Sequence, residues 1–315
     1  MTFAFQGGEP TLAGISFFQE AVRLQKQYGR PNLQVHNVIQ TNGTLLNLQW
    51  VQFLKEHHFL VGISLDGNES LHNLYRQDLH QKGSYSDVMG AIELLRSCDV
   101  PFNILIVVTA QTARRAREIY RFFDRKGLCY QQYIPCIDPM NTRDQKNKFT
   151  LTAAAYGKFL CTTFDLWYKD KVNGKFVYNR YFENLLGICL GRRPEACGML
   201  GHCGIQYAVE ADGSVYPCDF YMLDDYRLGN FNMDAIEEMD RVRKEIRFLE
   251  ESTEIHEDCL RCRWHSLCKS GCKRDRIVLE NDRFGKNRYC EAYRELFEYA
   301  VPKLVELARK ATPGK

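Results

Sequence analysis

The sequence predicts an α/β protein with a parallel sheet in its first half and a cysteine-rich region near its C-terminus. Short runs rich in β-branched and aromatic residues alternate with longer segments of helical periodicity, which is typical of repeated βα units. Eight of the 13 cysteines lie after residue 196. The chain has 315 residues, 45% of them hydrophobic, which is enough for a large core and one to three domains.

The first half divides into candidate strands separated by candidate helices. The strands are expected at residues 2–6, 33–40, 59–65, 102–109 and 130–135. The helices are expected between them, at about residues 12–28, 48–58, 86–97 and 113–126. The helical segments repeat their apolar residues with a period near 3.6, whereas the strand segments are short and rich in β-forming residues.

The first three strands end in short polar or glycine-containing loops at residues 7–10, 41–44 and 64–67. In parallel βα architectures the carboxyl ends of the strands carry the ligand site, so we expect the three loops to share one rim. The alternative is that the loops are turns selected for backbone geometry alone. For residues 41–44 both interpretations stay open.

The Gly-Gly-Glu-Pro loop after the first strand has the chemistry of a cofactor contact. Gly7 and Gly8 allow a ligand to approach the backbone closely, and Pro10 stops the strand. Glu9 offers a carboxylate for an ammonium group. The loop therefore suits the aminoacyl end of an amino-acid-like cofactor.

The late cysteines form two ordered groups that suit soft metals, because thiolates bind iron and zinc. They are Cys197, Cys203 and Cys218, followed by Cys259, Cys262, Cys268, Cys272 and Cys290. Eight thiolates are enough for two four-thiolate clusters. Taken alone, the C-x-x-C pair at 259–262 favours zinc over iron and sulfur. A disulfide framework is less favoured, because the total is odd and no secretory segment precedes it.

The charge and hydropathy patterns argue against two classes of partner. The formal net charge is +3 and no apolar run approaches the ~20 residues of a membrane span. The most basic stretch, residues 269–276 with Arg261 and Arg263 before it, interleaves with the cysteines. Compensation of an anionic metal–thiolate cluster, or a solvated face, explains it more simply than nucleic-acid binding. We expect no nucleic acid, no membrane and a cytoplasmic location.

Four features together resemble the anaerobic sulfatase-maturating enzymes, which are radical S-adenosylmethionine (SAM) enzymes with a cysteine-rich extension called SPASM. Three are strand-end segments, FAFQGGEPTLAG at 3–14, QTNGT at 40–44 and SLDG at 64–67. The fourth is the cysteine region. It contains a hairpin at 208–216 with an Asp212-Gly213 turn, Pro217-Cys218-Asp219-Phe220, C-x-x-C-x5-C-x3-C from 259 and Tyr289-Cys290. The resemblance covers essentially the whole chain.

The resemblance implies a partial (β/α)6 radical SAM barrel that lacks its first βα unit, followed by a SPASM domain and a C-terminal helix. The implied domains are an incomplete barrel at 1–150, a helical connector at 151–194 and the SPASM domain at 195–315. It also implies two auxiliary four-iron four-sulfur clusters. The cluster nearer the substrate would be held by Cys197, Cys203, Cys218 and Cys272. The outer cluster would be held by Cys259, Cys262, Cys268 and Cys290.

The implied activity is oxidation of a cysteine or serine of a sulfatase polypeptide to Cα-formylglycine. A 5′-deoxyadenosyl radical removes a Cβ hydrogen, an electron leaves through the nearer auxiliary cluster, and Asp219 takes the proton. Asp219 directly follows Cys218, so an anionic cluster beside it is expected to make its carboxylate a better base. The alternative is a solvated turn aspartate. An electron donor such as a flavodoxin or ferredoxin is a further implied partner.

The resemblance also assigns residues to the cofactor and the substrate. Gly8, Glu9, Ser64 and Asp66 are the candidate contacts to S-adenosylmethionine, and Gln6 would point toward the substrate. The alternatives are a backbone turn for Ser64 and a helix N-cap or loop stabiliser for Asp66.

One motif of the family is missing, the C-x-x-x-C-x-x-C that holds the SAM cluster. The chain begins with Met1 at what corresponds to the second strand, so S-adenosylmethionine and a third cluster are expected only in a full-length form. An incomplete gene model that starts at an internal Met is the favoured explanation. The other two are an inactive truncated chain and a protein that now serves another purpose. An in-frame motif within ~60 upstream residues would restore the enzyme function. The alternative functions are a non-catalytic iron–sulfur protein that binds peptides or relays electrons, and a different SPASM-type radical peptide modification.

Overall fold

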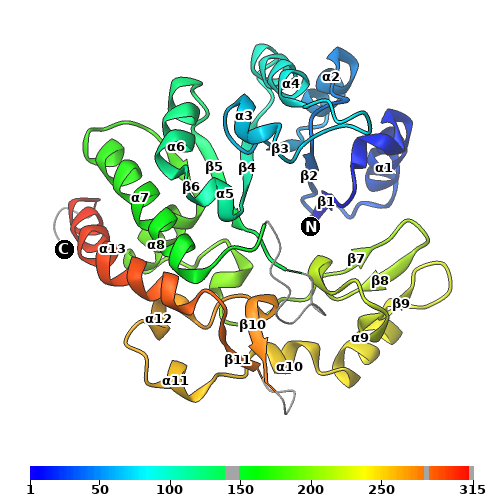
Figure 1. Cartoon of the computed structure of the whole chain (residues 1–315). Coiled ribbons are helices and arrows are strands. Elements are labelled where there is room, and N and C mark those ends of the chain that lie inside the picture. The colour runs from blue at the N-terminus through cyan, green and yellow to red at the C-terminus, as the bar shows by residue number, and fades with distance from the viewer. Residues whose placement is uncertain (139–148, 280–283, 312–315) are drawn as a thin grey trace. The chain divides into compact units, whose positions relative to one another are not determined.

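The computed structural model describes residues 1–138, 149–279 and 284–311. The chain divides into two compact units (Figure 1). The first unit contains Met1–Leu151 and Lys158–Tyr181, and the second contains Thr152–Gly157 and Phe182–Lys315. The domain boundaries expected near residues 150 and 194 stay a prediction.

The first unit is built on a six-stranded parallel sheet whose strands follow one another in chain order. They are β1 (Thr2–Phe5), β2 (His36–Thr41), β3 (Leu60–Ser64), β4 (Phe102–Val108), β5 (Tyr130–Pro135) and β6 (Tyr178–Asn179). The expected α/β class with a parallel sheet is confirmed. The sequence did not predict β6, because two residues are too few to form a pattern.

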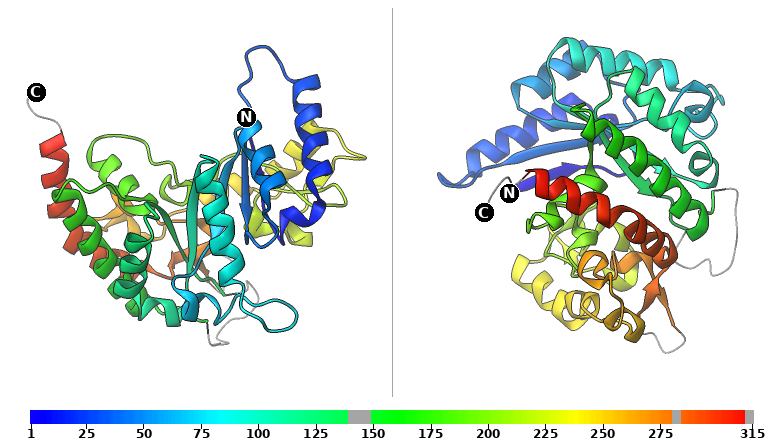
Figure 2. Two further views of the ribbon diagram at one scale, coloured as in Figure 1. Left: turned by 90° about the horizontal axis from the view of Figure 1, so that it is seen from above. Right: turned by 90° about the vertical axis from the view of Figure 1, so that its left-hand side faces the viewer.

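Helices connect these strands and lie along one face of the sheet (Figures 1 and 2). They are η1 (Pro10–Ala13), α1 (Ile15–Tyr28), α2 (Leu48–Glu56), α3 (Glu69–His72), α4 (Tyr85–Ser97), α5 (Ala110–Ala113) and α6 (Ala116–Arg125). The helix predicted at 12–28 is divided at Gly14, whose φ of 78° ends η1. The helix predicted at 113–126 is also divided into two. The first part, α5, begins before residue 113 at a capping box of Thr109 and Thr112, and the second part is α6.

The core of the first unit lies between the sheet and these helices. Ile63 of β3, Ile106 of β4, Val51 of α2, Ile92 of α4 and Phe123 of α6 are all fully buried. Burying each such side chain contributes roughly 1.5–3 kcal/mol. This packing fixes the strands whose carboxyl ends carry the predicted loops.

The second unit has two small antiparallel sheets and many short helices. The sheets are β7 (Ala208–Val209), β8 (Ser214–Tyr216) and β9 (Gly229–Asn230), and β10 (Arg276–Val278) with β11 (Phe284–Asn287). Helices α7 (Ala153–Val172) and α8 (Arg180–Cys189) have residues in both units. The others are η2 (Cys197–Met199), η3 (Asp219–Tyr221), η4 (Asp224–Tyr226), α9 (Ile236–Glu245), α10 (Phe248–Ser252), α11 (Glu257–Leu260), α12 (His265–Cys268), η5 (Lys273–Asp275) and α13 (Cys290–Ala311).

The hairpin predicted at 208–216 is confirmed, since Ala208 pairs with Tyr216 across antiparallel strands. Gly213 has φ 86°, as its position in the turn requires. Asp212 holds the turn through hydrogen bonds that its carboxylate accepts from Ser214 N (2.8 Å) and Ser214 Oγ (2.9 Å). No helix in the described parts of the chain is long and apolar enough to cross a membrane. The cytoplasmic location stays a prediction.

Candidate active site and metal centres

The loop after β1 contains two glycines with left-handed backbone. Gly7 has φ 88° and Gly8 has φ 52°, where an L side chain is strained. A Cβ built on either residue would meet no atom of the described residues within 4 Å. Backbone conformation rather than crowding therefore requires glycine here, and the space beside the backbone is open to a ligand.

Glu9 joins the ends of β1 and β2 through its carboxylate. Oε1 accepts hydrogen bonds from Thr11 N (3.1 Å), Thr11 Oγ1 (2.6 Å) and Thr41 Oγ1 (2.6 Å). Oε2 accepts one from Asn42 N (2.7 Å). The loops at 7–10 and 41–44 therefore meet at one carboxylate. Each carboxylate oxygen has two lone pairs, so Oε2 keeps one position that can accept from an ammonium group.

Asp66 joins the end of β3 to β4. Its Oδ2 accepts from Arg76 Nε (2.5 Å) and its Oδ1 accepts from Val107 N (3.0 Å). The Asp66 side chain is buried, and hydrogen bonds at both oxygens satisfy a charge that would otherwise be costly. These are the contacts of a loop stabiliser, the alternative that the sequence left open. The role of Asp66 as a contact to S-adenosylmethionine stays a prediction.

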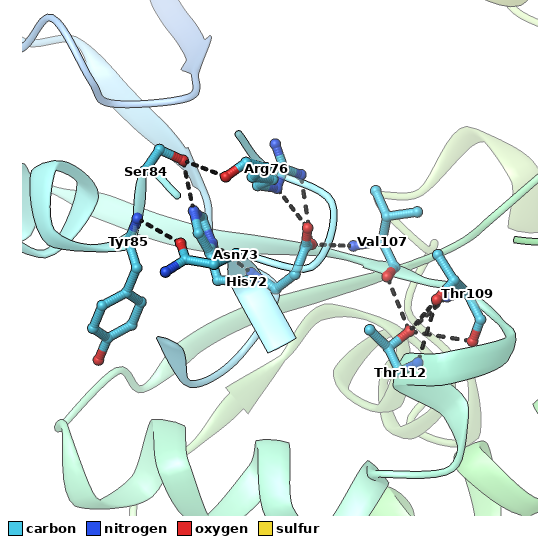
Figure 3. Close-up of polar contacts among 9 residues, drawn as sticks. His72, Asn73, Arg76, Ser84, Tyr85, Val107, Thr109 and Thr112 are labelled. Atoms are coloured by element: carbon cyan, nitrogen blue, oxygen red, sulfur yellow. Dashed lines mark hydrogen bonds and ion pairs between the residues drawn. The ribbon is translucent and has the colours of Figure 1, made fainter. Parts of the chain in front are cut away.

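His72 belongs to a chain of hydrogen bonds behind this carboxylate (Figure 3). Its Nδ1 accepts from Asp66 N (3.4 Å), so the proton lies on Nε2, which donates to Ser84 Oγ (3.0 Å). The Ser84 hydroxyl in turn donates to Arg76 O (3.1 Å). Burial lowers the pKa of His72 to about 4, with Asp66 opposing that shift and Arg76 adding to it. The neutral imidazole is therefore a structural part of the rim.

Ser64 and Gln6 complete the predicted rim. Ser64 is the last residue of β3 and is buried, and its hydroxyl forms no hydrogen bond with the described residues. It is therefore available to a ligand. Gln6 follows β1 and is exposed. The predicted cofactor and substrate residues thus follow or end β1 and β3, which both pair with β2, at the carboxyl edge of one sheet.

The structure brings together the four cysteines assigned to the nearer cluster. Burial raises the pKa of the Cys272 thiol to about 12, and Asp275 and the thiols of Cys197 and Cys203 act in the same direction. Burial also raises the pKa of the Cys218 thiol, and Cys272 is among the groups that add to this shift. Such effects act over several ångströms only. Cys272 therefore lies near each of the other three thiols.

Asp219 is exposed and begins η3 directly after Cys218. The Cys218 thiol donates a hydrogen bond to Asp219 Oδ1 (3.2 Å). A cysteine that binds a metal gives up its proton, so this bond and ligation by Cys218 exclude each other. Cluster binding would therefore remove this donor from the carboxylate that is proposed to accept a proton.

The four cysteines assigned to the outer cluster line a cavity of about 460 Å³. Burial raises the pKa of the Cys268 thiol to about 12, and the thiols of Cys290, Cys259 and Cys262 act in the same direction. The second group of thiols is therefore also assembled. In both groups the members coincide with the sets that the sequence assigned, although the ligand roles themselves stay a prediction.

The lining of this cavity fits an anionic cluster. Three buried polar atoms have no hydrogen-bond partner in the described parts of the chain, and their residues all line the cavity: Trp264 Nε1, His265 Nε2 and Ser270 Oγ. Unpaired buried polar atoms cost about 1–3 kcal/mol each, and donors around a metal–sulfur group tune it. Within the described residues, no three His, Cys, Asp or Glu side chains are arranged to hold a single metal ion.

A left-handed run of backbone separates the two thiol groups. Lys269, Ser270 and Gly271 have φ of 46°, 65° and 67° and lie between Cys268 and Cys272. Each non-glycine residue in this region costs on the order of 1–3 kcal/mol. Gly271 N donates to Cys268 O (2.9 Å), which closes the turn. The run directs successive cysteines of one short segment toward different thiol groups.

Two family models match the chain and define its class. The model described as "Radical SAM superfamily" matches residues 2–123, and the SPASM model, described as "Iron-sulfur cluster-binding domain", matches residues 202–263. The first covers β1 to α6, and the second covers the small sheet and the first C-x-x-C pair. The protein is therefore a radical SAM oxidoreductase with an iron–sulfur SPASM domain.

Individual relatives identify the family. The cysteine-type anaerobic sulfatase-maturating enzyme of Clostridium perfringens (strain 13 / Type A) is 46% identical over 98% of this chain and 83% of the relative. A serine-type enzyme of Bacteroides thetaiotaomicron is 31% identical over 95% of this chain and 76% of the relative. The solved structure "Native anSMEcpe with bound AdoMet and Cp18Cys peptide" superposes with a TM-score of 0.94 at 45% identity, covering 99% of this chain and 86% of that one. The chain belongs to the anaerobic sulfatase-maturating enzymes.

These comparisons confirm the resemblance seen in the sequence and the radical SAM fold. They also replace zinc, which the C-x-x-C pair alone favoured, with iron and sulfur. Sequence reasoning missed Arg76 and His72. His72 ends the four-residue helix α3 and Arg76 follows it, and so short an element gives no periodic pattern. It also missed Trp264 and His265. Their position between Cys262 and Cys268 was the signal that could have found them.

Proposed function

We propose that this protein oxidises a cysteine of a sulfatase polypeptide to Cα-formylglycine, using S-adenosylmethionine and iron–sulfur clusters. The observation that carries the proposal is the pair of four-cysteine groups, in a chain 46% identical to a cysteine-type enzyme. The lower identity of 31% to a serine-type enzyme supports cysteine over serine as the residue oxidised.

Two auxiliary four-iron four-sulfur clusters are assigned to the two thiol groups. One is held by Cys197, Cys203, Cys218 and Cys272, and the other by Cys259, Cys262, Cys268 and Cys290. Such clusters, when bound, accept and release single electrons. The orphaned donors around the outer thiols support this assignment. Metal binding also requires the buried thiols to lose protons that burial makes harder to remove.

S-adenosylmethionine is assigned to the rim of the parallel sheet. The open backbone at Gly8 accommodates its aminoacyl end, Glu9 Oε2 accepts from its ammonium group, and the Ser64 hydroxyl binds a polar atom of the cofactor. Asp66 positions the Ser64 loop through Arg76 and Val107 N. Gln6 extends toward the sulfatase peptide. The solved relative has AdoMet and a peptide bound, which supports sites for both ligands on this chain.

The test of the activity uses a form of the protein that carries the C-x-x-x-C-x-x-C motif upstream of Met1, with peptides that present Cys or Ser. We expect formation of the aldehyde from the Cys peptide, with the Ser peptide slower.

Asp219 is the general base of the proposed reaction. In the same assay Asp219→Asn should retain its iron and lose product formation by roughly 100-fold or more. Asp225→Asn, an exposed aspartate in η4, is the control. Product formation at the wild-type rate by Asp219→Asn would contradict the role.

An acidic one-electron donor such as a flavodoxin or ferredoxin is the proposed redox partner, docking on α6. Arg114, Arg117, Arg121 and Arg125 are exposed along this helix and the turn before it. Their side chains form no hydrogen bond or ion pair with the described residues, so the positive row is free to complement an acidic surface. Arg117→Glu with Arg121→Glu should weaken flavodoxin binding at low salt by about tenfold or more. The matched control, Lys26→Glu with Arg30→Glu, should leave binding unchanged.

A further inference from the structure

Arg276 is a buried cation without an anionic partner in the described residues. It begins β10, and only 4% of its surface is exposed. Its Nη1 donates to Ser252 O (2.8 Å) and Glu254 O (2.9 Å), and its Nη2 donates to Gly271 O (3.2 Å). All three acceptors are backbone carbonyls, and none carries a formal charge. The guanidinium is therefore solvated by dipoles but not neutralised.

Such an arrangement is costly unless a negative charge lies nearby. An unpaired charge in the interior is unfavourable, and Arg276 Nε has no hydrogen-bond partner among the residues that the structure describes. Carbonyl dipoles recover only part of this cost. No carboxylate among the described residues pairs with Arg276, so the negative charge must come from another group.

The contacts of Arg276 place it directly behind the nearer thiol group. Ser252, whose carbonyl it binds, also accepts a hydrogen bond at Oγ from Cys203 N (2.9 Å). Gly271, whose carbonyl it also binds, precedes Cys272. Burial lowers the pKa of Arg276, and the thiols of Cys203, Cys272 and Cys259 oppose this shift. Cys259 belongs to the outer group, so Arg276 lies within electrostatic reach of both.

We propose that Arg276 is a counter-charge shared by the two cluster sites and raises the reduction potential of both clusters. The proposal rests on the proposed function, because it requires the two four-thiolate clusters assigned above. A cluster becomes more negative when it gains an electron, so a fixed positive charge stabilises the reduced form. Arg276 binds the backbone beside Cys203 and Cys272, so the effect is larger on the nearer cluster.

Lys273 provides a contrast within the same segment. It is also almost fully buried, but its Nζ pairs with Glu251 Oε2 (2.8 Å) and lies 4.2 Å from the ring centroid of Phe248. A neutralised pair produces a weaker field than an isolated charge. Lys273 therefore contributes less to the cluster potentials than Arg276, although it directly follows Cys272.

The test is a redox titration of the anaerobically reconstituted protein, followed by electron paramagnetic resonance, with iron counted per chain. Arg276→Gln should lower the midpoint potentials of both clusters, more for the nearer one. Arg276→Lys keeps the charge and should retain potentials close to the wild type. Arg243→Gln is the matched control, because Arg243 is 3% exposed and contacts Asp240 and Gln206 O rather than a cluster cysteine. It should leave both potentials unchanged.

Unchanged potentials in an Arg276→Gln protein with full iron would overturn the proposal. If Arg276→Gln does not retain iron, Arg276→Lys decides the matter. Wild-type potentials in that variant support a role of the charge, and lowered potentials despite the retained charge overturn it. Failure of the proposed function is distinguishable, because a wild-type protein that binds no iron would be seen before any variant is compared.

Discussion

Glu9 is one carboxylate that organises two strand ends. Four hydrogen bonds from three residues converge on it. Thr41 and Asn42 belong to a loop that the sequence placed at the rim, and Thr11 lies in η1, directly after the Glu9 loop. The same side chain was assigned to the ammonium group of the cofactor. The structure adds a second role for it, because the loops that receive the cofactor depend on the carboxylate for their own conformation.

Glu9→Gln is therefore expected to reduce stability as well as cofactor binding. The amide nitrogen cannot accept a hydrogen bond, so at least one of the donors Thr11, Thr41 and Asn42 loses its partner, at a cost of about 1–3 kcal/mol. Urea denaturation of the reconstituted protein measures the loss. Glu20→Gln removes an exposed ion pair with Arg23 and should leave stability nearly unchanged, because solvent screens such a pair. Equal effects of the two changes would contradict this role of Glu9.

His72 gives the rim a pH dependence whose sign follows from its lowered pKa. In the folded protein the pKa is about 4, and in the unfolded chain it is about 6.5. Between these values the unfolded chain binds a proton that the folded chain does not. Stability is therefore full above pH 6.5 and falls as the pH decreases toward 4, by about 3 kcal/mol in all. Protonation would also place a donor at Nδ1 against Asp66 N–H.

Replacing His72 should flatten this dependence. Between pH 7.5 and pH 5.5 the wild type should lose about 1.4 kcal/mol from this group, seen as a decrease in Tm. His72→Gln is less stable at pH 7.5 but should lack the decrease. His80→Gln, at an exposed position, should keep it. A wild-type pH dependence in His72→Gln would contradict the assignment.

At the scale of elements, the helices around the outer thiols are too short to be stable alone. Helices α11 and α12 have four residues each, whereas isolated helices below about 12 residues are marginal in water. Cys259 lies in α11, Cys268 ends α12, and Cys290 begins α13. A cluster that binds all three would replace the stability that these elements lack.

Removal of iron by a chelator is therefore expected to loosen residues 257–272 selectively. Their amide hydrogens should exchange at least 10-fold faster. This factor corresponds to a decrease of about 1.4 kcal/mol in the free energy of local opening. Strands β3 and β4 of the parallel sheet, whose side chains are mostly buried in the core of the first unit, should keep their protection. Hydrogen–deuterium exchange followed by mass spectrometry measures both regions in one experiment. Uniform loosening of both would contradict the prediction.

The sequence predicts some elements of this fold and not others, for physical reasons. Strands β1 to β5 were predictable because each is a short run of β-forming residues that ends near a turn. Residues such as Asp66 and Arg76 could not be paired in advance, because their contact depends on tertiary packing. The left-handed backbone of Lys269 and Ser270 has no sequence signal either, since neither residue favours that conformation.

At the scale of the whole molecule, each thiol group is expected to bind its irons independently of the other. The chain as given should bind about eight irons, four at each thiol group. Cys259→Ala should reduce this to about four and leave the nearer cluster in place, whereas Cys98→Ala, outside both groups, should retain all of it. Iron and sulfide analysis after anaerobic reconstitution measures the content. A full complement in Cys259→Ala, or zinc in the wild type, would contradict the cluster assignment.

The left-handed turn between Cys268 and Cys272 has a consequence for electron transfer. These cysteines are assigned to different clusters, yet four residues of extended chain span at most about 14 Å, and the bond from Gly271 N to Cys268 O shortens the interval. The short segment between Cys268 and Cys272 therefore limits the distance between the two clusters. Inserting one residue into this turn would allow the clusters to lie farther apart. Electron transfer between them would then be slower, even if every cysteine were kept.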